Sequence, residues 1–222
     1  RGPANVWVRS RTRTPSRARW LTSASTWSTV GAMDDALLAD LAAEHAVLDT
    51  VVADLDEAAW DTPSSAAGWT IADQIHHLDV SDRLALASLA GEAVPKMESD
   101  PVIPALTSRA SGAEILASWR ATRTEMLERA AEVDSRAVLD WVASSLSART
   151  LVTTRLTECW AHGLDCVVAL GVEPVDTDRL RHIAWLGWRS LPYAFTIAGE
   201  EPPAPTDRLA VVLESPTGDT WR

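Results

Sequence analysis

The hydrophobic residues between positions 34 and 58 recur at alternating intervals of three and four residues. The series consists of Leu38, Leu41, His45, Leu48, Val52 and Leu55. Such spacing places these side chains on one face of an α-helix and is typical of the buried face of a helix bundle. His45 is the polar member of this face. It could be a fourth residue of a metal site, and the simpler interpretation is a buried histidine bonded to a neighbouring polar group.

Three further segments show an amphipathic helical pattern. The second helix is predicted from the capping residue Thr70 to about residue 90, and the third begins at Ser111, where Glu114 completes a capping box. The fourth helix covers about 149–170. Four such helices predict a mainly α protein built on a four-helix bundle, and the long second and third connectors allow a crossover topology.

The pattern changes after Pro174. A fifth helix is predicted over about 177–198, followed by a strand at 208–214 and a turn at 215–219. The sequence ends where a second strand is expected to begin. Because one strand with an interrupted partner is not a stable sheet, we expect this part to be the start of a truncated α/β C-terminal domain.

These patterns divide the chain into three parts. Residues 1–32 contain six Arg and no acidic residue, and we interpret them as a disordered or mis-annotated extension, with translation starting at Met33. A transit peptide, which is also Arg- and Ser-rich, is the alternative. Residues 33–173 are the predicted metal-binding bundle, and residues 174–222 are the incomplete C-terminal domain.

The net charge of the chain is -11, and the acidic residues all lie after the Arg-rich start. An acidic surface argues against binding to nucleic acid or to an anionic membrane. Cys159 and Cys166 would lie about 10 Å apart along one helix, which is too far for a disulfide. Two reduced cysteines and the lack of a membrane-length apolar run favour a cytoplasmic protein.

The most informative motif is a polar stripe on the apolar fourth helix. Glu158, His162 and Asp165 follow at intervals of four and three residues, so their side chains share one face. A Glu and a His one turn apart can bind the same metal ion, and His77 on the second helix offers a third ligand. Two His and one Glu form a known catalytic zinc set that leaves one position open.

Neighbouring residues allow more than one interpretation. His76 points about 100° away from His77 around the helix, so we expect it at the surface or an interface. Asp165 could orient a ligand imidazole, cap a neighbouring backbone or pair with an Arg. Arg83 could bind a substrate carboxylate or form a surface ion pair. Trp69 and Trp160 could form the walls of a pocket, with simple packing as the alternative. Arg181 and His182 could approach a substrate from the fifth helix, and the simpler interpretation places them on a solvated helix face.

The segments Gly68–Leu78, Glu158–Asp165 and Asp178–Arg189 resemble the mycothiol-dependent maleylpyruvate isomerase-like family of the DinB-like superfamily. The similarity is to an actinobacterial metal-binding branch, some members of which carry a wyosine-formation label on their C-terminal part. The resemblance covers about residues 34–221. It implies a DinB-like bundle that binds a divalent metal, zinc, through His77, Glu158 and His162, with mycothiol or a similar thiol as cosubstrate.

We therefore predict a zinc-dependent transferase or isomerase that uses a low-molecular-weight thiol and an electrophilic small molecule, with a homodimer as its assembly. A non-catalytic metal-binding protein, such as a sensor or store, is the first alternative. A bundle whose polar stripe is purely structural is the second. The wyosine label is discounted, because tRNA chemistry would require a surface that binds nucleic acid.

Overall fold

The structure, a computed structural model, describes residues 31–96, 110–142, 144–201 and 211–221. In chain order its elements are α1 (Asp35–Val52), the 3-10 helix η1 (Ala59–Asp61), α2 (Ile71–Leu89), α3 (Gly112–Glu132), β1 (Val138–Leu139), β2 (Leu146–Ser147), α4 (Ala148–Ala169), α5 (Leu180–Ala198), β3 (Leu213–Glu214) and β4 (Thr220–Trp221). The mainly α prediction is confirmed. Residues 1–30 of the predicted extension and 208–210 of the predicted strand lie outside the described residues.

Local hydrogen bonds set the helix boundaries. The predicted cap at Thr70 and the predicted capping box at Ser111 are both present, and Thr70 forms a capping box of its own with Asp73. The first helix is shorter than predicted, because it ends at Val52 instead of near residue 58. The Asp56 carboxylate accepts a hydrogen bond from the backbone N–H of Ala59 at 2.8 Å, so this segment forms a turn and η1 instead of further helix.

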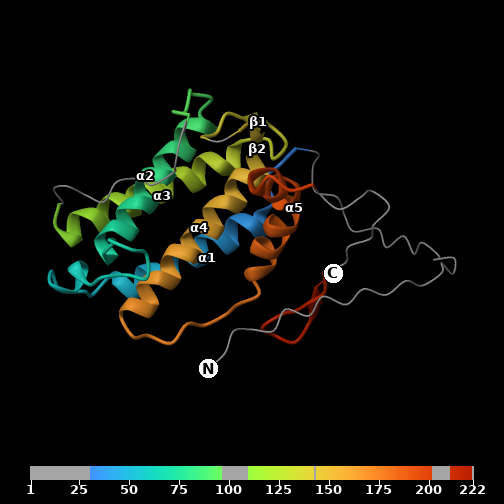
Figure 1. Cartoon of the computed structure of the whole chain (residues 1–222). Coiled ribbons are helices and arrows are strands. Elements are labelled where there is room, and N and C mark those ends of the chain that lie inside the picture. The colour runs from blue at the N-terminus through green and yellow to red at the C-terminus, as the bar shows by residue number, and fades with distance from the viewer. Residues whose placement is uncertain (1–30, 97–109, 143, 202–210, 222) are drawn as a thin grey trace, which may run out of the picture.

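The buried apolar residues form two clusters, one at each end of the bundle. The first cluster takes residues from the start of α1 and α4 and from the end of α2 and α3, and the second takes the opposite ends. Helices α1 and α4 therefore run in one direction and α2 and α3 in the other. Parallel α2 and α3 correspond to the crossover topology that the long connectors allow. Figure 1 shows α1 beside α4 and α2 beside α3, and α2 also packs against α4.

A layer of buried polar side chains separates the two apolar clusters. Each helix contributes one member, and we call His45, Asp82, Thr122 and Arg155 the polar layer. The Trp119 indole N–H donates to Asp82 at 3.3 Å, and Arg155 lies 3.8 Å from the other oxygen of that carboxylate. Burial raises the pKa of Asp82 to about 6 even though the positive charge of Arg155 opposes this shift.

His45 gives the polar layer a pH dependence. Its ring lies edge-on to Trp119 with centroids 5.7 Å apart, and its Nδ1 has no hydrogen-bond partner among the described residues. Burial, with a smaller contribution from the charges of Arg123 and Arg155, lowers the pKa of His45 to about 3. His45 is therefore neutral in the folded protein, and its protonation favours unfolding.

We expect the free energy of unfolding to fall as the pH decreases from about 6.5 towards the lowered pKa, because the unfolded chain then binds a proton that folded His45 does not. His45→Phe removes this proton, so the slope should decrease by up to about 1.4 kcal/mol per pH unit. Urea unfolding of both proteins across this range measures the difference. Equal slopes would show that His45 is not the titrating group.

Helix α5 packs against α4 (Figure 1). Ion pairs join its N-terminal end to α1. Arg179 donates to Glu44 at 2.6 Å, and His182 lies 2.8 Å from the Asp40 carboxylate. The expectation that His182 lies on a solvated helix face is wrong: the residue is only 9% exposed, because the Asp40 carboxylate holds it against α1. Arg181 contacts the same carboxylate.

The short strands form two antiparallel pairs. In the connector before α4, β1 pairs with β2 through Val138 opposite Ser147. Near the C-terminus β3 pairs with β4. The described part of the predicted strand is limited to Leu213–Glu214. Its partner strand, which was expected only to begin where the sequence ends, is present as Thr220–Trp221. None of the helices in the described ranges is long and apolar enough to cross a lipid bilayer.

Candidate metal centre

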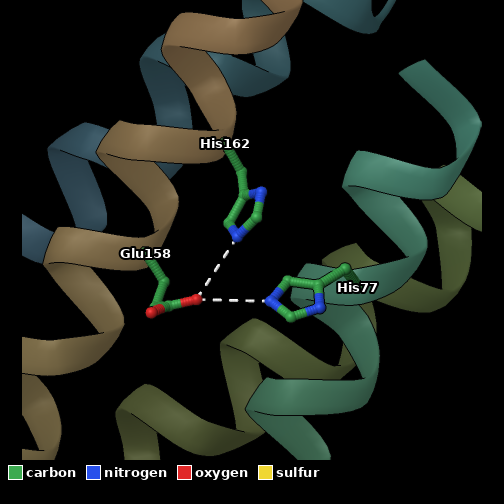
Figure 2. A group of neighbouring side chains, drawn as sticks. All are labelled: His77, Glu158 and His162. Atoms are coloured by element: carbon green, nitrogen blue, oxygen red, sulfur yellow. Dashed lines mark hydrogen bonds and ion pairs between the residues drawn. The ribbon is translucent and has the colours of Figure 1, made fainter. Parts of the chain in front are cut away.

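Helices α2 and α4 bring the three predicted ligands together (Figure 2). His77 Nε2 lies 3.2 Å from Glu158 Oε2, and His162 Nε2 lies 3.3 Å from the same oxygen. All three candidate ligand atoms are within 4.8 Å of one another, and no other such group of His, Cys, Asp and Glu occurs in the part of the chain that the structure describes. The fold thus joins residues that are about eighty positions apart in the sequence.

Two of the three separations between the candidate ligand atoms match those of a tetrahedral metal site. Two ligand atoms on one tetrahedral zinc, each about 2.0–2.1 Å from the metal, are about 3.3 Å apart. The two N···O separations here are 3.2 and 3.3 Å. The donor set of two imidazole nitrogens and one carboxylate oxygen also matches catalytic zinc sites, which keep a fourth position for water or substrate.

The protonation states suit a cation as well. Burial opposes ionisation of Glu158, but its contacts with the imidazoles of His162 and His77 and the charge of Arg155, 3.7 Å away, hold its pKa well below its usual range. Burial is also the largest cause that lowers the pKa of His77. At neutral pH the site therefore offers an ionised carboxylate, whose side chain is 40% exposed and leaves a route from solvent.

Trp69 forms a wall over the two imidazoles. Its ring is stacked on His162 at a centroid distance of 5.9 Å with an interplanar angle of 13°, and it is tilted over His77 at 5.3 Å. The Trp69 carbonyl accepts hydrogen bonds from the backbone N–H and the hydroxyl of Ser64. The loop before α2 thus shields one side of the site, which the sequence had left open as an alternative to simple packing.

Comparison with known proteins decides the family. Residues 41–166 match the model of the mycothiol maleylpyruvate isomerase N-terminal domain, and this match covers more than half of the chain. The chain belongs to this family. The matched region contains all three candidate ligands, the whole of α2 and α4 up to Cys166, which confirms the predicted resemblance.

Relatives and solved structures agree with this family. Two uncharacterized proteins of Mycobacterium tuberculosis, from strains CDC 1551 / Oshkosh and ATCC 25618 / H37Rv, are each 43% identical over 194 residues, which is 83% of this chain and 75% of each relative. A crystal structure of a histidine-to-alanine variant of the mycothiol-dependent maleylpyruvate isomerase has a TM-score of 0.54 at 14% identity, covering 84% of this chain and 78% of that one. This likeness supports the DinB-like four-helix fold.

In this member of the isomerase family, Gln74 is the site residue that sequence reasoning missed. The Gln74 Oε1 atom contacts His162 Nδ1, and the Gln74 amide nitrogen donates to Asp165 at 3.1 Å. Asp165, which was one candidate for orienting a ligand imidazole directly, therefore contacts His162 only through Gln74. The available signal was an amide among the core-facing positions of the second helix, near Ile71 and Leu78.

The other candidates lie away from the cluster. His76 is not part of it, and His45 belongs to the polar layer. Arg83 pairs with the Asp79 carboxylate at 3.2 Å, as expected for an ion pair. Trp160 lines a different hollow together with Glu44. The family member thus builds its candidate centre from His77, Glu158 and His162, with Gln74, Asp165 and Trp69 around them.

Proposed function

We propose that this chain binds one zinc ion through His77, Glu158 and His162 and uses a low-molecular-weight thiol of the mycothiol type to isomerise, or to be transferred to, an electrophilic small molecule. The observation that carries the proposal is the convergence of two imidazole nitrogens on one carboxylate oxygen at 3.2 and 3.3 Å. Membership of the mycothiol maleylpyruvate isomerase family supports the choice of cosubstrate.

Each residue of the site would have a separate chemical role. His77 and His162 supply neutral nitrogens and Glu158 supplies charge, so the set holds a divalent cation with its fourth position free. When bound, the zinc would hold a thiol as its nucleophilic thiolate. Trp69 covers the imidazoles and restricts water on that side. The exposed side of Glu158 is where a thiol and an electrophile would approach.

The chain's own cysteines support an external thiol. Cys159 and Cys166 are both free and buried. Burial raises the pKa of Cys166 to about 12 and that of Cys159 well above its usual value, so neither forms a thiolate readily. Since the thiolate is the nucleophile in thiol chemistry, a reactive sulfur has to come from a cosubstrate.

Reduced cysteines and a thiol cosubstrate fit a reducing compartment, so we propose that the protein acts in the cytoplasm of an actinobacterium. The relatives in Mycobacterium tuberculosis support that source. The homodimer stays a prediction. The resemblance to a branch that carries the wyosine-formation label also stays a prediction, and the tRNA chemistry behind that label stays discounted.

An assay that follows both the loss of thiol, for transfer, and the conversion of the electrophile, for isomerisation, tests the proposal. The zinc-loaded chain is incubated with mycothiol, and in parallel with bacillithiol, across a panel of electrophiles that includes maleylpyruvate. We expect turnover that requires zinc, is lost in His162→Ala and is kept in His76→Ala. Zinc binding with no turnover for any pair would overturn the enzymatic proposal in favour of a metal sensor or store. Turnover that survives removal of the metal would overturn the role of the site.

A further inference from the structure

We propose that Gln74 is a positioning residue, which holds His162 in the tautomer that carries its hydrogen on Nδ1 and so directs the Nε2 lone pair at the metal position. This inference rests on the proposed function for the metal itself. What it adds is a reason why a fully buried amide, 0% exposed, lies in the apolar face of α2. Burying an amide without hydrogen bonds is costly, so the hydrogen-bond partners of Gln74 indicate its role.

The orientation of the Gln74 amide follows from its partners. Its nitrogen donates to Ser64 Oγ at 2.8 Å and to Asp165 Oδ2 at 3.1 Å. An ionised carboxylate only accepts hydrogen bonds, and Ser64 already donates its one hydroxyl hydrogen to the Trp69 carbonyl at 3.1 Å. Both partners therefore require the amide nitrogen, and the carbonyl oxygen Oε1 is the atom that faces His162.

The tautomer of His162 follows in turn. Gln74 Oε1 carries no hydrogen, so the hydrogen bond between it and His162 needs the hydrogen on Nδ1. A neutral imidazole has only one N–H, and Nε2 is then left with a lone pair, 3.3 Å from Glu158 Oε2. Two acceptors that face each other at this distance repel, and a cation between them turns the repulsion into two favourable bonds.

No comparable hydrogen bond fixes the tautomer of His77. Its Nδ1 is buried and has no hydrogen-bond partner among the described residues, while its Nε2 lies 3.2 Å from the same Glu158 oxygen. Without a metal, His77 can donate its Nε2 hydrogen to Glu158, so it has to change tautomer before it can act as a ligand. The two histidines therefore differ: His162 is set in advance by Asp165, Ser64 and Gln74, and His77 is not.

Two variants test the role of Gln74. Gln74→Leu keeps the size and apolar packing but removes the acceptor for His162 Nδ1. The second is a double variant, Gln74→Glu with Asp165→Asn, which leaves the net charge unchanged and which we call the exchange variant. It keeps an acceptor at position 74 and places a donor at position 165. Nitrogen-15 NMR of the imidazoles in the metal-free proteins at mildly alkaline pH reports the tautomer, competition titration reports the affinity for zinc alone, and thermal unfolding reports stability.

In the wild-type chain we expect the Nδ1–H form for His162 and the Nε2–H form for His77. Gln74→Leu should move the His162 hydrogen towards Nε2 and weaken zinc binding about 10- to 100-fold, as is typical when the partner of a ligand histidine is lost. The exchange variant should keep the Nδ1–H form and most of the affinity.

A wild-type tautomer and wild-type zinc affinity in Gln74→Leu, with only the melting temperature changed, would reduce Gln74 to a structural role and overturn the inference. Loss of affinity in the exchange variant equal to that in Gln74→Leu would also overturn it. The tautomer is measured without metal, so the two proposals can fail separately. A wild-type chain that binds no zinc but shows His162 in the Nδ1–H form would reject the proposed function and still support the role of Gln74 in fixing the tautomer.

Discussion

His77→Ala is expected to weaken zinc binding by on the order of a hundred- to a thousandfold, whereas alanine at the neighbouring His76 leaves the affinity unchanged. Tetrahedral zinc sites bind with roughly 10–16 kcal/mol, so one of four ligands is worth about 2.5–4 kcal/mol, and 1.4 kcal/mol is tenfold in affinity. Only His77 lies in the cluster with Glu158 and His162. Competition titration with a chromophoric chelator measures both variants.

The His76 variant is a close control, because it removes the same side chain one position away on the same helix. Equal losses in both variants would point to an effect on the fold of α2 and contradict the assigned ligand. An unchanged affinity in His77→Ala would place the metal elsewhere in the protein.

Arg155→Met is expected to lower the free energy of unfolding by about 3–5 kcal/mol, because it leaves a buried carboxylate without its cation. Arg155 and Asp82 are both 3% exposed as side chains, and their ion pair spans 3.8 Å. The Arg155 guanidinium also lies 3.7 Å from Glu158, so its loss affects the metal centre as well as the polar layer.

The pH dependence identifies the cause. The pKa of Asp82 is already raised to about 6 by burial, and without Arg155 it rises further. A raised carboxyl pKa makes the folded state less stable as the pH increases, so the loss should be larger at about pH 8 than at about pH 5. Urea unfolding of Arg155→Met, alone and with Asp82→Asn, tests this. The second change should restore part of the stability, and a loss under about 1 kcal/mol in the single variant would contradict an essential ion pair.

The local features of the bundle could be predicted from the sequence because their causes are local. The capping boxes at Thr70 and Ser111 need only residues three positions apart, and the 3-4 spacing around Leu41 needs only one helix. The three candidate ligands were also found, because Glu158 and His162 share a helix face and His77 carries the family motif. Their convergence across two helices is what the structure adds.

The remaining features depend on contacts between distant segments. The sequence shows His45 and Asp82 as interruptions in apolar stripes, but only the packing of four helices reveals that Thr122 and Arg155 complete a layer with them. In the same way, the pattern of the fifth helix cannot show that His182 forms a hydrogen bond with Asp40 on α1.

The residues that orient the ligands also depend on distant contacts. The sequence left three roles open for Asp165, one of which was direct contact with a ligand imidazole, and it gave no sign that Gln74 lies between them. Ninety-one positions separate Gln74 from Asp165, so no local pattern could join the two residues. Local pattern and the family motif thus predicted the candidate ligands, while the residues that contact them could be recognised only from the fold.

Zinc X-ray absorption on the purified wild-type chain tests the central claim most directly. We expect about one zinc per chain, nitrogen and oxygen ligands at about 2.0–2.1 Å with the outer-shell scattering of imidazole, and no sulfur ligand before a thiol is added. Addition of mycothiol should then introduce a single zinc–sulfur distance of about 2.3 Å. Zinc–sulfur scattering in the thiol-free protein, or a chain that holds no stoichiometric metal, would contradict a centre built from His77, Glu158 and His162.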